Sequence, residues 1–154
     1  MALQISYDDV FSSFLGYVND YQIASLNMDD AYDLMVEYLH KAYAKPYVRR
    51  LFINSTMDDE IHTFTFTMAF PIDDDADFDF TVDILAKGMV IEWLHPQVKN
   101  KVNLTQMITS SKESKFYAQA NHLSELRSLL EDVTLDQRKM IRDRGWINNE
   151  YLTK

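Results

Sequence analysis

Residues 78–94 are apolar on nearly every side of a helix, and this segment constrains the fold more than any other. A helix of this kind must be buried by its neighbours. Its one polar face carries Asp83 and Lys87, an (i, i+4) pair suited to solvent. Glu92 lies about half a turn away, at roughly 100° per residue, and therefore needs a partner, most simply an arginine of another helix or another subunit. The sequence thus predicts a helical bundle around this segment, with Pro96 ending the central helix before a polar linker over residues 97–114. A weak apolar patch in this linker leaves a short helix open: Leu104, Met107 and Ile108.

Other helices are indicated by caps and by apolar spacing. Ser6 and Asn27 each precede acidic residues and a helical stripe, so each is expected to cap a helix, the second ending near Ala44 before a proline. A final helix is expected over residues 115–144, closed by Gly145 in the left-handed conformation. At 1.5 Å per residue it would be ~45 Å long, which suggests a lateral contact. Its stripe follows a 3-4 spacing with a glutamine at one position: Leu123, Leu126, Leu130, Val133, Gln137 and Met140.

Residues 61–70 alternate between apolar and mostly threonine side chains, which is the strongest strand signal in the chain. The obvious partner strand is 47–53, joined through a turn at 54–59, and this gives a hairpin arm over about 47–70. A two-stranded hairpin is marginally stable alone, so it must pack on the helices or on a neighbour. We expect its apolar side chains to contact a partner: Phe64, Phe66, Met68 and Phe70.

These patterns together predict a mainly α fold. It is a bundle of three or four helices with a long C-terminal helix and an inserted β-hairpin arm. The length of 154 residues suits one domain over 1–154, with a C-terminal tail over 146–154. Trp146 and Tyr151 in this tail belong to residue types enriched at interfaces, so we expect them to contact a partner.

Charge is divided unevenly along the chain. Residues 1–92 carry 17 acidic and 5 basic residues, whereas residues 93–154 carry 7 and 10. The net charge of −9 argues against unaided binding to nucleic acid. We expect a subunit interface at four charged residues, three of which cluster near the end of the last helix: Glu92, Arg138, Arg142 and Arg144. An acidic run leads into the central helix and is expected to be solvated: Asp73, Asp74, Asp75 and Asp77.

No motif in the chain marks an enzyme. The absence of cysteine removes disulfides, thiol catalysis and thiolate-bound metals. The four histidines lie in separate segments, the three glycines form no phosphate-binding loop, and the acidic run lacks the glycine and glutamate of a calcium-binding loop. We therefore expect a non-enzymatic protein with no catalytic residue, metal or cofactor. The N-terminal residues lack the pattern of a signal peptide, and we expect no membrane association.

Four segments are similar to those of a known family. Residues 88–96, GMVIEWLHP, resemble a GMVxEWLxP segment. Residues 115–123, KFYAQANHL, resemble KFYSQANHL, with Ala118 in place of serine, and residues 141–146, IRDRGW, resemble IRDxGY. With KPYVR at 45–49, these segments resemble small virion structural proteins of tailed phages infecting Firmicutes, placed at the head–tail connector or neck.

The resemblance implies an adaptor whose copies form a ring, commonly twelvefold, beneath the portal. Such a subunit is assembled in the host cytoplasm, stays in the virion neck, and contacts further copies, the portal protein and a stopper or tail-terminator protein. DNA passes through the ring without specific binding. Two alternatives stay open, a tail-terminator or tail-completion protein and an acidic DNA mimic that inhibits a host enzyme. In a ring, like charge would keep DNA from adhering to channel-facing acids: Asp73, Asp74, Asp75 and Asp77.

Overall fold

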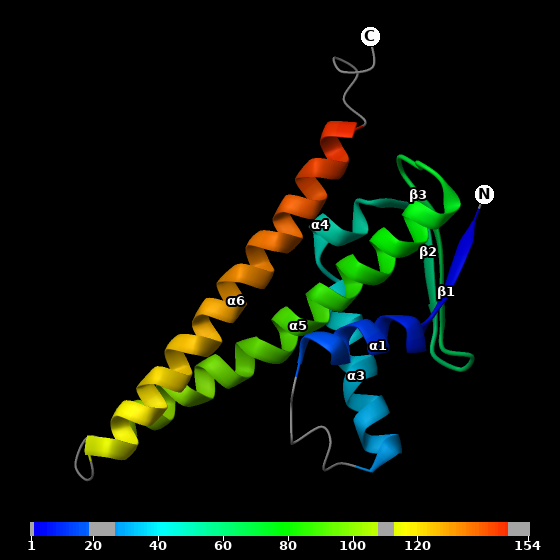
Figure 1. The fold of residues 1–154 in the computed structure, drawn as a ribbon. Helices are drawn as coiled ribbons and strands as arrows, with labels where there is room; N and C mark the ends of the chain where they lie inside the picture. The colour runs from blue at the N-terminus through cyan, green and yellow to red at the C-terminus, as the bar shows by residue number, and fades with distance from the viewer. Residues whose placement is uncertain (1, 19–26, 108–112, 148–154) are drawn as a thin grey trace.

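The computed structural model of the chain describes residues 2–18, 27–107 and 113–147. This part is mainly helical, as predicted, and also contains a small antiparallel sheet (Figure 1). Along the chain the elements are β1 (Leu3–Ser6), α1 (Tyr7–Tyr17), α3 (Met28–Tyr43), α4 (Pro46–Arg49), β2 (Phe52–Asp58), β3 (Thr63–Met68), α5 (Asp74–Met107) and α6 (Glu113–Ile147).

The central helix is α5, and α1, α3 and α6 pack around it (Figure 1). Burying a leucine or isoleucine side chain stabilises a fold by about 1.5–3 kcal/mol relative to leaving it exposed. The middle of α5 is buried on most sides, which confirms the prediction from its apolar pattern. Its buried side chains include Ile84, Leu85, Ala86, Met89, Val90 and Leu94.

The helix α5 is longer than predicted, because Pro96 lies inside it and does not end it. Proline removes one backbone hydrogen bond from a helix. Here the side chain of Gln97 donates a hydrogen bond to the backbone oxygen of Trp93 at 3.4 Å, and α6 packs along α5 (Figure 1). Packing of this kind compensates for one lost hydrogen bond. Residues 97–107, expected to form a polar linker, are therefore helical.

Three helices meet at Gly88 of α5. A Cβ atom added there would lie 2.8 Å from Ala42 Cβ of α3 and 3.3 Å from Gln137 Nε2 of α6. Gln137 occupies the polar position anticipated in the 3-4 stripe, is 1% exposed, and donates a hydrogen bond to the backbone oxygen of Ile84 at 3.4 Å. Glycine is needed here because a side chain would hold the three helices apart.

The last helix ends later than predicted. It continues to Ile147, and Gly145 lies within it; no described glycine has a positive φ. At 1.5 Å per residue α6 is about 52 Å long. Its N-terminal half and the C-terminal half of α5 together extend beyond the rest of the molecule (Figure 1). In the described ranges, no helix combines the length and the apolar character needed to cross a membrane.

Both predicted N-terminal caps are present. Ser6 Oγ accepts a hydrogen bond from the Asp9 N–H at 3.2 Å, and the Asp9 carboxylate accepts one from the Ser6 N–H at 3.4 Å, which completes a capping box. Asn27 Oδ1 accepts a hydrogen bond from the Asp30 N–H at 2.8 Å. The C-cap of α3 is Ala44, also as predicted.

The alternating segment forms the central strand of a three-stranded sheet ordered β1–β3–β2 (Figure 1). On β3, Phe64, Phe66 and Met68 are buried, while the threonines between them are partly exposed. The extra strand β1 places Ile5 opposite Phe64. It is too short to show a periodic pattern, and it supplies the hairpin's neighbour from the same chain.

The first strand of the hairpin lies later in the sequence than predicted. Residues 52–58 form β2, so most of the expected turn is strand, and residues 46–49 form α4. Proline at the first position of a helix favours helix formation over an extended strand. The turn falls at 59–62, where His62 adopts a φ of 54°. The hairpin is part of the packed sheet and does not project as an arm.

Candidate interaction surface

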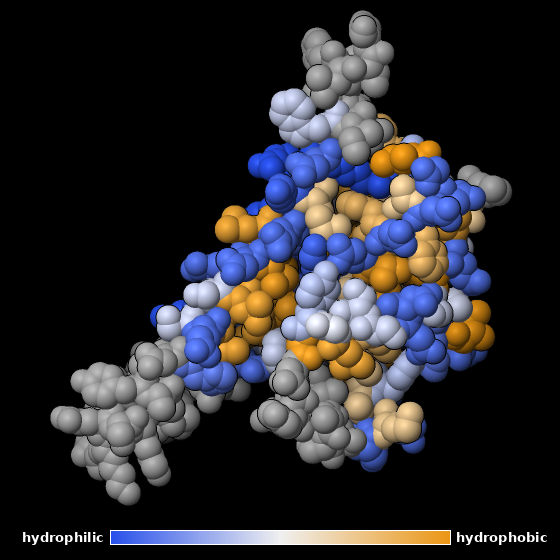
Figure 2. All heavy atoms as spheres, in the orientation of Figure 1, coloured by the Kyte–Doolittle hydropathy of each residue, from blue (hydrophilic) through white to orange (hydrophobic). Residues whose placement is uncertain are grey.

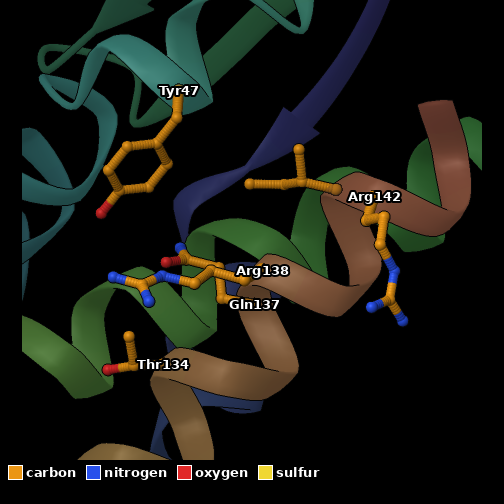
Figure 3. Close-up of a pocket in the computed structure, with 6 residues that line it drawn as sticks. Tyr47, Thr134, Gln137, Arg138 and Arg142 are labelled. Carbon is orange, nitrogen blue, oxygen red and sulfur yellow. The ribbon is translucent and has the colours of Figure 1, made fainter.

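A groove lies between α4 and the C-terminal half of α6. Its larger hollow, of about 340 Å³, is lined by Tyr47, Thr134, Gln137, Arg138, Ile141 and Arg142. Arg138 extends along the side of the groove where Tyr47 lies, whereas Arg142 points away from Tyr47 (Figure 3). A smaller hollow of about 210 Å³ shares Ile141 and is lined by Arg50, Leu51, Phe70, Ile141, Arg144 and Gly145. We call the two hollows the α4–α6 groove.

Helical spacing explains why the groove has a neutral floor. Thr134 and Ile141 are seven residues apart, so they lie two turns from each other on one face of α6. Thr134 Oγ1 donates a hydrogen bond to the backbone oxygen of Leu130 at 2.7 Å, and the Gln137 side chain is bonded within the core as described above. The floor is therefore apolar or already hydrogen-bonded.

The rim of the groove is cationic. Arg50, Arg138 and Arg142 are all exposed. Arg142 contacts the adjacent Asp143 at 3.5 Å, but both side chains are largely exposed, and such pairs contribute at most about 1 kcal/mol. Arginine binds carboxylates through two parallel hydrogen bonds. The groove is therefore suited to an acidic partner that also carries an apolar side chain.

The start of α3 is acidic. A hollow of about 570 Å³ there is lined by Asp8, Met28, Asp29, Tyr32, Asp33 and His62. Met28 is 89% exposed between the N-cap and the acidic residues. Burial, together with the charge of Asp8, raises the pKa of Tyr32 to about 12, so its phenol stays protonated at neutral pH. We call Asp8, Met28, Asp29 and Asp33 the α3 acidic end.

A cluster of titratable side chains joins the hairpin turn to two helices. The Tyr7 hydroxyl donates a hydrogen bond to Asp59 at 2.5 Å, and His40 Nε2 lies 2.9 Å from the same carboxylate. The hydrogen bond from Tyr7 lowers the pKa of Asp59, while burial and that hydrogen bond raise the pKa of Tyr7. The Tyr7 hydroxyl is buried and protonated, whereas the side chains of His40 and Asp59 are 45% and 52% exposed. The cluster fixes the β2–β3 turn to α1 and α3.

Among the described residues, no group of three or more histidine, aspartate or glutamate side chains is placed to hold a metal ion. His122 and Glu125, an (i, i+3) pair, lie 3.9 Å apart on the exposed face of α6.

The structure corrects the predicted contact role of three strand residues. Phe64, Phe66 and Met68 are buried in the chain's own core. The ring of Phe52 lies 5.5 Å from the rings of both Phe64 and Phe66. Strand alternation correctly identified the apolar face of β3, but the helices of the same chain cover this face, and no partner is needed to do so. Phe70, just beyond β3, is exposed and lines the α4–α6 groove.

Two predicted surface charges are instead buried against each other. Asp77 and Arg144 form an ion pair at 2.5 Å, with side chains only 3% and 7% exposed. Arg144 also donates a hydrogen bond to the backbone oxygen of Phe70 at 3.0 Å, and its guanidinium lies over the Phe80 ring at 4.5 Å. Asp77 therefore does not face a channel and Arg144 does not face another subunit. The pair joins the start of α5 to the end of α6.

Glu92 is turned away from solvent, as predicted, and its partner belongs to the same chain. Its side chain is 13% exposed and lies 3.2 Å from Lys45 Nζ, between α3 and α4. The expected partner was an arginine of another helix or subunit, so the identity of the partner is corrected. The predicted pair of Asp83 and Lys87 is present at 3.2 Å, but its face is not open to solvent as expected: Lys87 is only 14% exposed, and its Nζ also lies 3.2 Å from Met140 Sδ of α6.

The other predicted site residues are at the surface or outside the described ranges. Tyr151 lies outside them. The exposed residues are Asp73, Asp74 and Asp75 at the start of α5, and Arg138, Arg142 and Trp146 on α6.

Sequence reasoning missed several residues of these two surfaces. Tyr47 and Arg50 were assigned to a strand, although Pro46 at a first helical position was a signal for α4. Met28 was overlooked, although it continues the apolar stripe of α3 three residues before Ala31; it lies in the first turn and is 89% exposed.

Comparison with known proteins gives no match of the chain to a family model, to a curated protein or to a solved structure. The α4–α6 groove and the α3 acidic end are the surfaces from which a function is inferred.

Proposed function

We propose that this chain is a non-enzymatic structural protein of a tailed-phage virion, a head–tail connector (adaptor) subunit that forms a ring beneath the portal. The observation that carries the proposal is the separation of two complementary surfaces. The α4–α6 groove is cationic, and the α3 acidic end lies at the far end of α3 (Figure 1). A contact between two different patches repeats from copy to copy, and it closes into a ring when the rotation between copies divides a full turn.

The segments that resemble connector proteins support the proposal by their positions. Residues 45–49 contain all of α4 and contribute Tyr47 to the groove, and residues 141–146 contribute part of its floor and part of its rim. Residues 88–96 contribute to the core of α5. Two of the four similar segments thus line the surface that would contact another subunit.

The acidic character of the chain suits a DNA channel. The net charge is −9, and Asp73, Asp74 and Asp75 are exposed at the start of α5. Like charge removes the attraction between a protein surface and phosphate groups. A ring lined by these residues would let DNA pass without specific binding, while its two faces dock the portal and a stopper or tail protein.

Sedimentation velocity and negative-stain electron microscopy test the proposal. The purified chain is measured alone and mixed with the portal protein encoded in the same gene cluster. We expect rings, either of the chain alone or assembled on the portal. A chain that stays a monomer or dimer in both conditions contradicts the proposal, and inhibition of a nucleic-acid enzyme by that monomer would favour a DNA mimic. Rings that bind a tail tube but not the portal would favour a tail terminator.

A further inference from the structure

We infer that the α4–α6 groove is the receptor for the α3 acidic end of a second copy of this chain. Met28 would enter the groove, and Asp29 and Asp33 would meet its arginines. This inference rests on the ring-forming role proposed above and names the two surfaces that form the ring contact.

The groove offers two kinds of recognition at once. Its floor includes Ile141 and one side of it is formed by the ring of Tyr47, so it accepts an apolar side chain. The exposed arginines at positions 50, 138 and 142 surround that floor. An occupant therefore needs an apolar group close to two or more carboxylates.

The α3 acidic end presents that combination. Met28 is 89% exposed, the highest value among the chain's exposed large hydrophobic side chains that the structure describes. Asp29 is the next residue, and Asp33 lies one turn further along α3, on the same side of the helix as Asp29. Figure 2 shows apolar atoms beside hydrophilic ones at this end of the molecule. A methionine side chain is unbranched and adapts to irregular hollows, which suits it to a groove of about 340 Å³.

The placement of the two surfaces favours a second copy as the occupant. The helix α3 has 16 residues and is about 24 Å long, with the acidic end at its N-terminus and α4 following its C-terminus (Figure 1). One copy therefore cannot place its own α3 acidic end in its own groove. A contact made in one direction leaves the groove of one copy and the acidic end of the other unoccupied, so it propagates from copy to copy, whereas a reciprocal contact would stop at a two-fold dimer.

Disulfide trapping between copies tests the contact directly, because the chain has no cysteine of its own. The variant with Met28→Cys and Thr134→Cys places one thiol on each surface and leaves the arginines intact. Mild oxidation with copper phenanthroline should give a ladder of covalent dimers, trimers and larger species on a denaturing gel. Met28→Cys with Leu135→Cys is the matched control, since Leu135 is 61% exposed but does not line the groove. Equal ladders from both variants, or none from the first, would overturn the inference.

Exchange of charge between the surfaces gives an independent test. One variant carries Arg138→Glu and Arg142→Glu, and the other carries Asp29→Lys and Asp33→Lys. We expect each variant alone to lose at least tenfold in assembly, measured as the concentration for half-maximal oligomer by mass photometry. An equimolar mixture should assemble again, because the acidic groove of the first accepts the basic α3 end of the second. A mixture no better than either variant alone would contradict the contact.

The outcomes separate this inference from the proposed function. Rings that form on the portal equally well from the wild type and from both charge variants would remove the contact but leave the ring role standing. A wild type that forms no ring, either alone or on the portal, would remove the ring role, whatever the trapping experiment gives.

Discussion

Arginines of the same helix have opposite environments in this molecule. Arg144 is buried near the end of α6 and paired with Asp77, whereas Arg138 and Arg142 are exposed on the rim of the α4–α6 groove. All three lie within seven residues and look alike in the sequence. The difference shows that a basic cluster on a helix can serve two purposes, one within the fold and the other at its surface.

Helical periodicity separates the two groups once the stripe is extended. The 3-4 spacing that runs through Val133, Gln137 and Met140 reaches Arg144 as its next position. Arg138 and Arg142 lie off that stripe. The 3-4 spacing therefore places Arg144 on the buried side of α6. A charged residue at such a position is nevertheless interpreted as exposed unless a partner for its charge is identified. The partner, Asp77, lies 67 residues earlier and was hidden in a run of acids.

The largest expected effect is that of breaking the buried pair. Arg144→Met should lower the free energy of unfolding by about 3–5 kcal/mol, because it leaves the Asp77 carboxylate buried without its cation. Urea unfolding followed by circular dichroism measures the change. The double variant Asp77→Leu with Arg144→Met should recover most of that loss, since an apolar pair of similar volume replaces the ion pair. If Arg144→Met unfolds like the wild type, the pair does not stabilise the fold.

Much of the fold followed from the sequence because local signals and tertiary packing agree there. The caps at Ser6 and Asn27, the buried α5 and the inward face of β3 were all predicted correctly. The errors arose where tertiary contacts overrode a local signal. Pro96 did not end α5, because packing with α6 sustains the helix.

The candidate site was less predictable than the fold. Its two surfaces combine segments distant in sequence, α4 with α6 and α1 with α3, and no periodic pattern links such segments. The sequence did identify Arg138 and Arg142 as contact residues, a prediction that the experiments above test. The sequence could not show that the chain's own helices cover Phe64 and Phe66, because burial of this face of β3 depends on how all the helices and strands of the chain pack together.

Substitution at Gly88, where α3, α5 and α6 meet, should have the next largest effect on stability. Because Gln137 contacts this position and also lines the α4–α6 groove, the substitution tests whether the floor of the groove depends on packing of the core. Gly88→Ala should lower the free energy of unfolding by about 1–3 kcal/mol, because the new methyl would lie 2.8 Å from Ala42 Cβ. Adding Ala42→Gly should restore part of the loss. Gly16→Ala is the matched control: nothing lies within 4 Å of that position, and alanine should stabilise the helix by up to about 1 kcal/mol. Equal effects of the two alanine substitutions in thermal melts would contradict the tight contact.

A smaller, pH-dependent effect is expected at Asp59, a partly exposed counterpart of the buried pair. The pKa of this carboxyl is lowered in the folded chain, chiefly by the hydrogen bond from Tyr7. Its charged form therefore stabilises the fold above the ordinary aspartate pKa of about 4, and this stabilisation is lost as the pH falls through the lowered pKa. Tyr7→Phe should cost about 1 kcal/mol at pH 7 and less at pH 3, measured by urea unfolding.

The matched control for this experiment is Tyr43→Phe. The Tyr43 hydroxyl is hydrogen-bonded to Ser55, a neutral group, so its removal should cost the same at pH 7 and pH 3. A Tyr7→Phe cost that does not change with pH would show that the Asp59 charge is not stabilised by this hydrogen bond.

The smallest expected effect on stability is at the groove rim, and it gives the sharpest contrast with Arg144. Arg138→Gln and Arg142→Gln, alone or together, should change the free energy of unfolding by less than about 0.5 kcal/mol, because exposed side chains contribute little to stability. The same substitutions should weaken assembly, and added salt should weaken wild-type assembly too, since exposed charge contacts are screened over about 10 Å at 0.1 M salt. Urea unfolding and mass photometry of the same samples measure both quantities. A variant that loses stability as Arg144→Met does would place these arginines within the fold, whereas an unchanged assembly would show that the α4–α6 groove is not a contact surface.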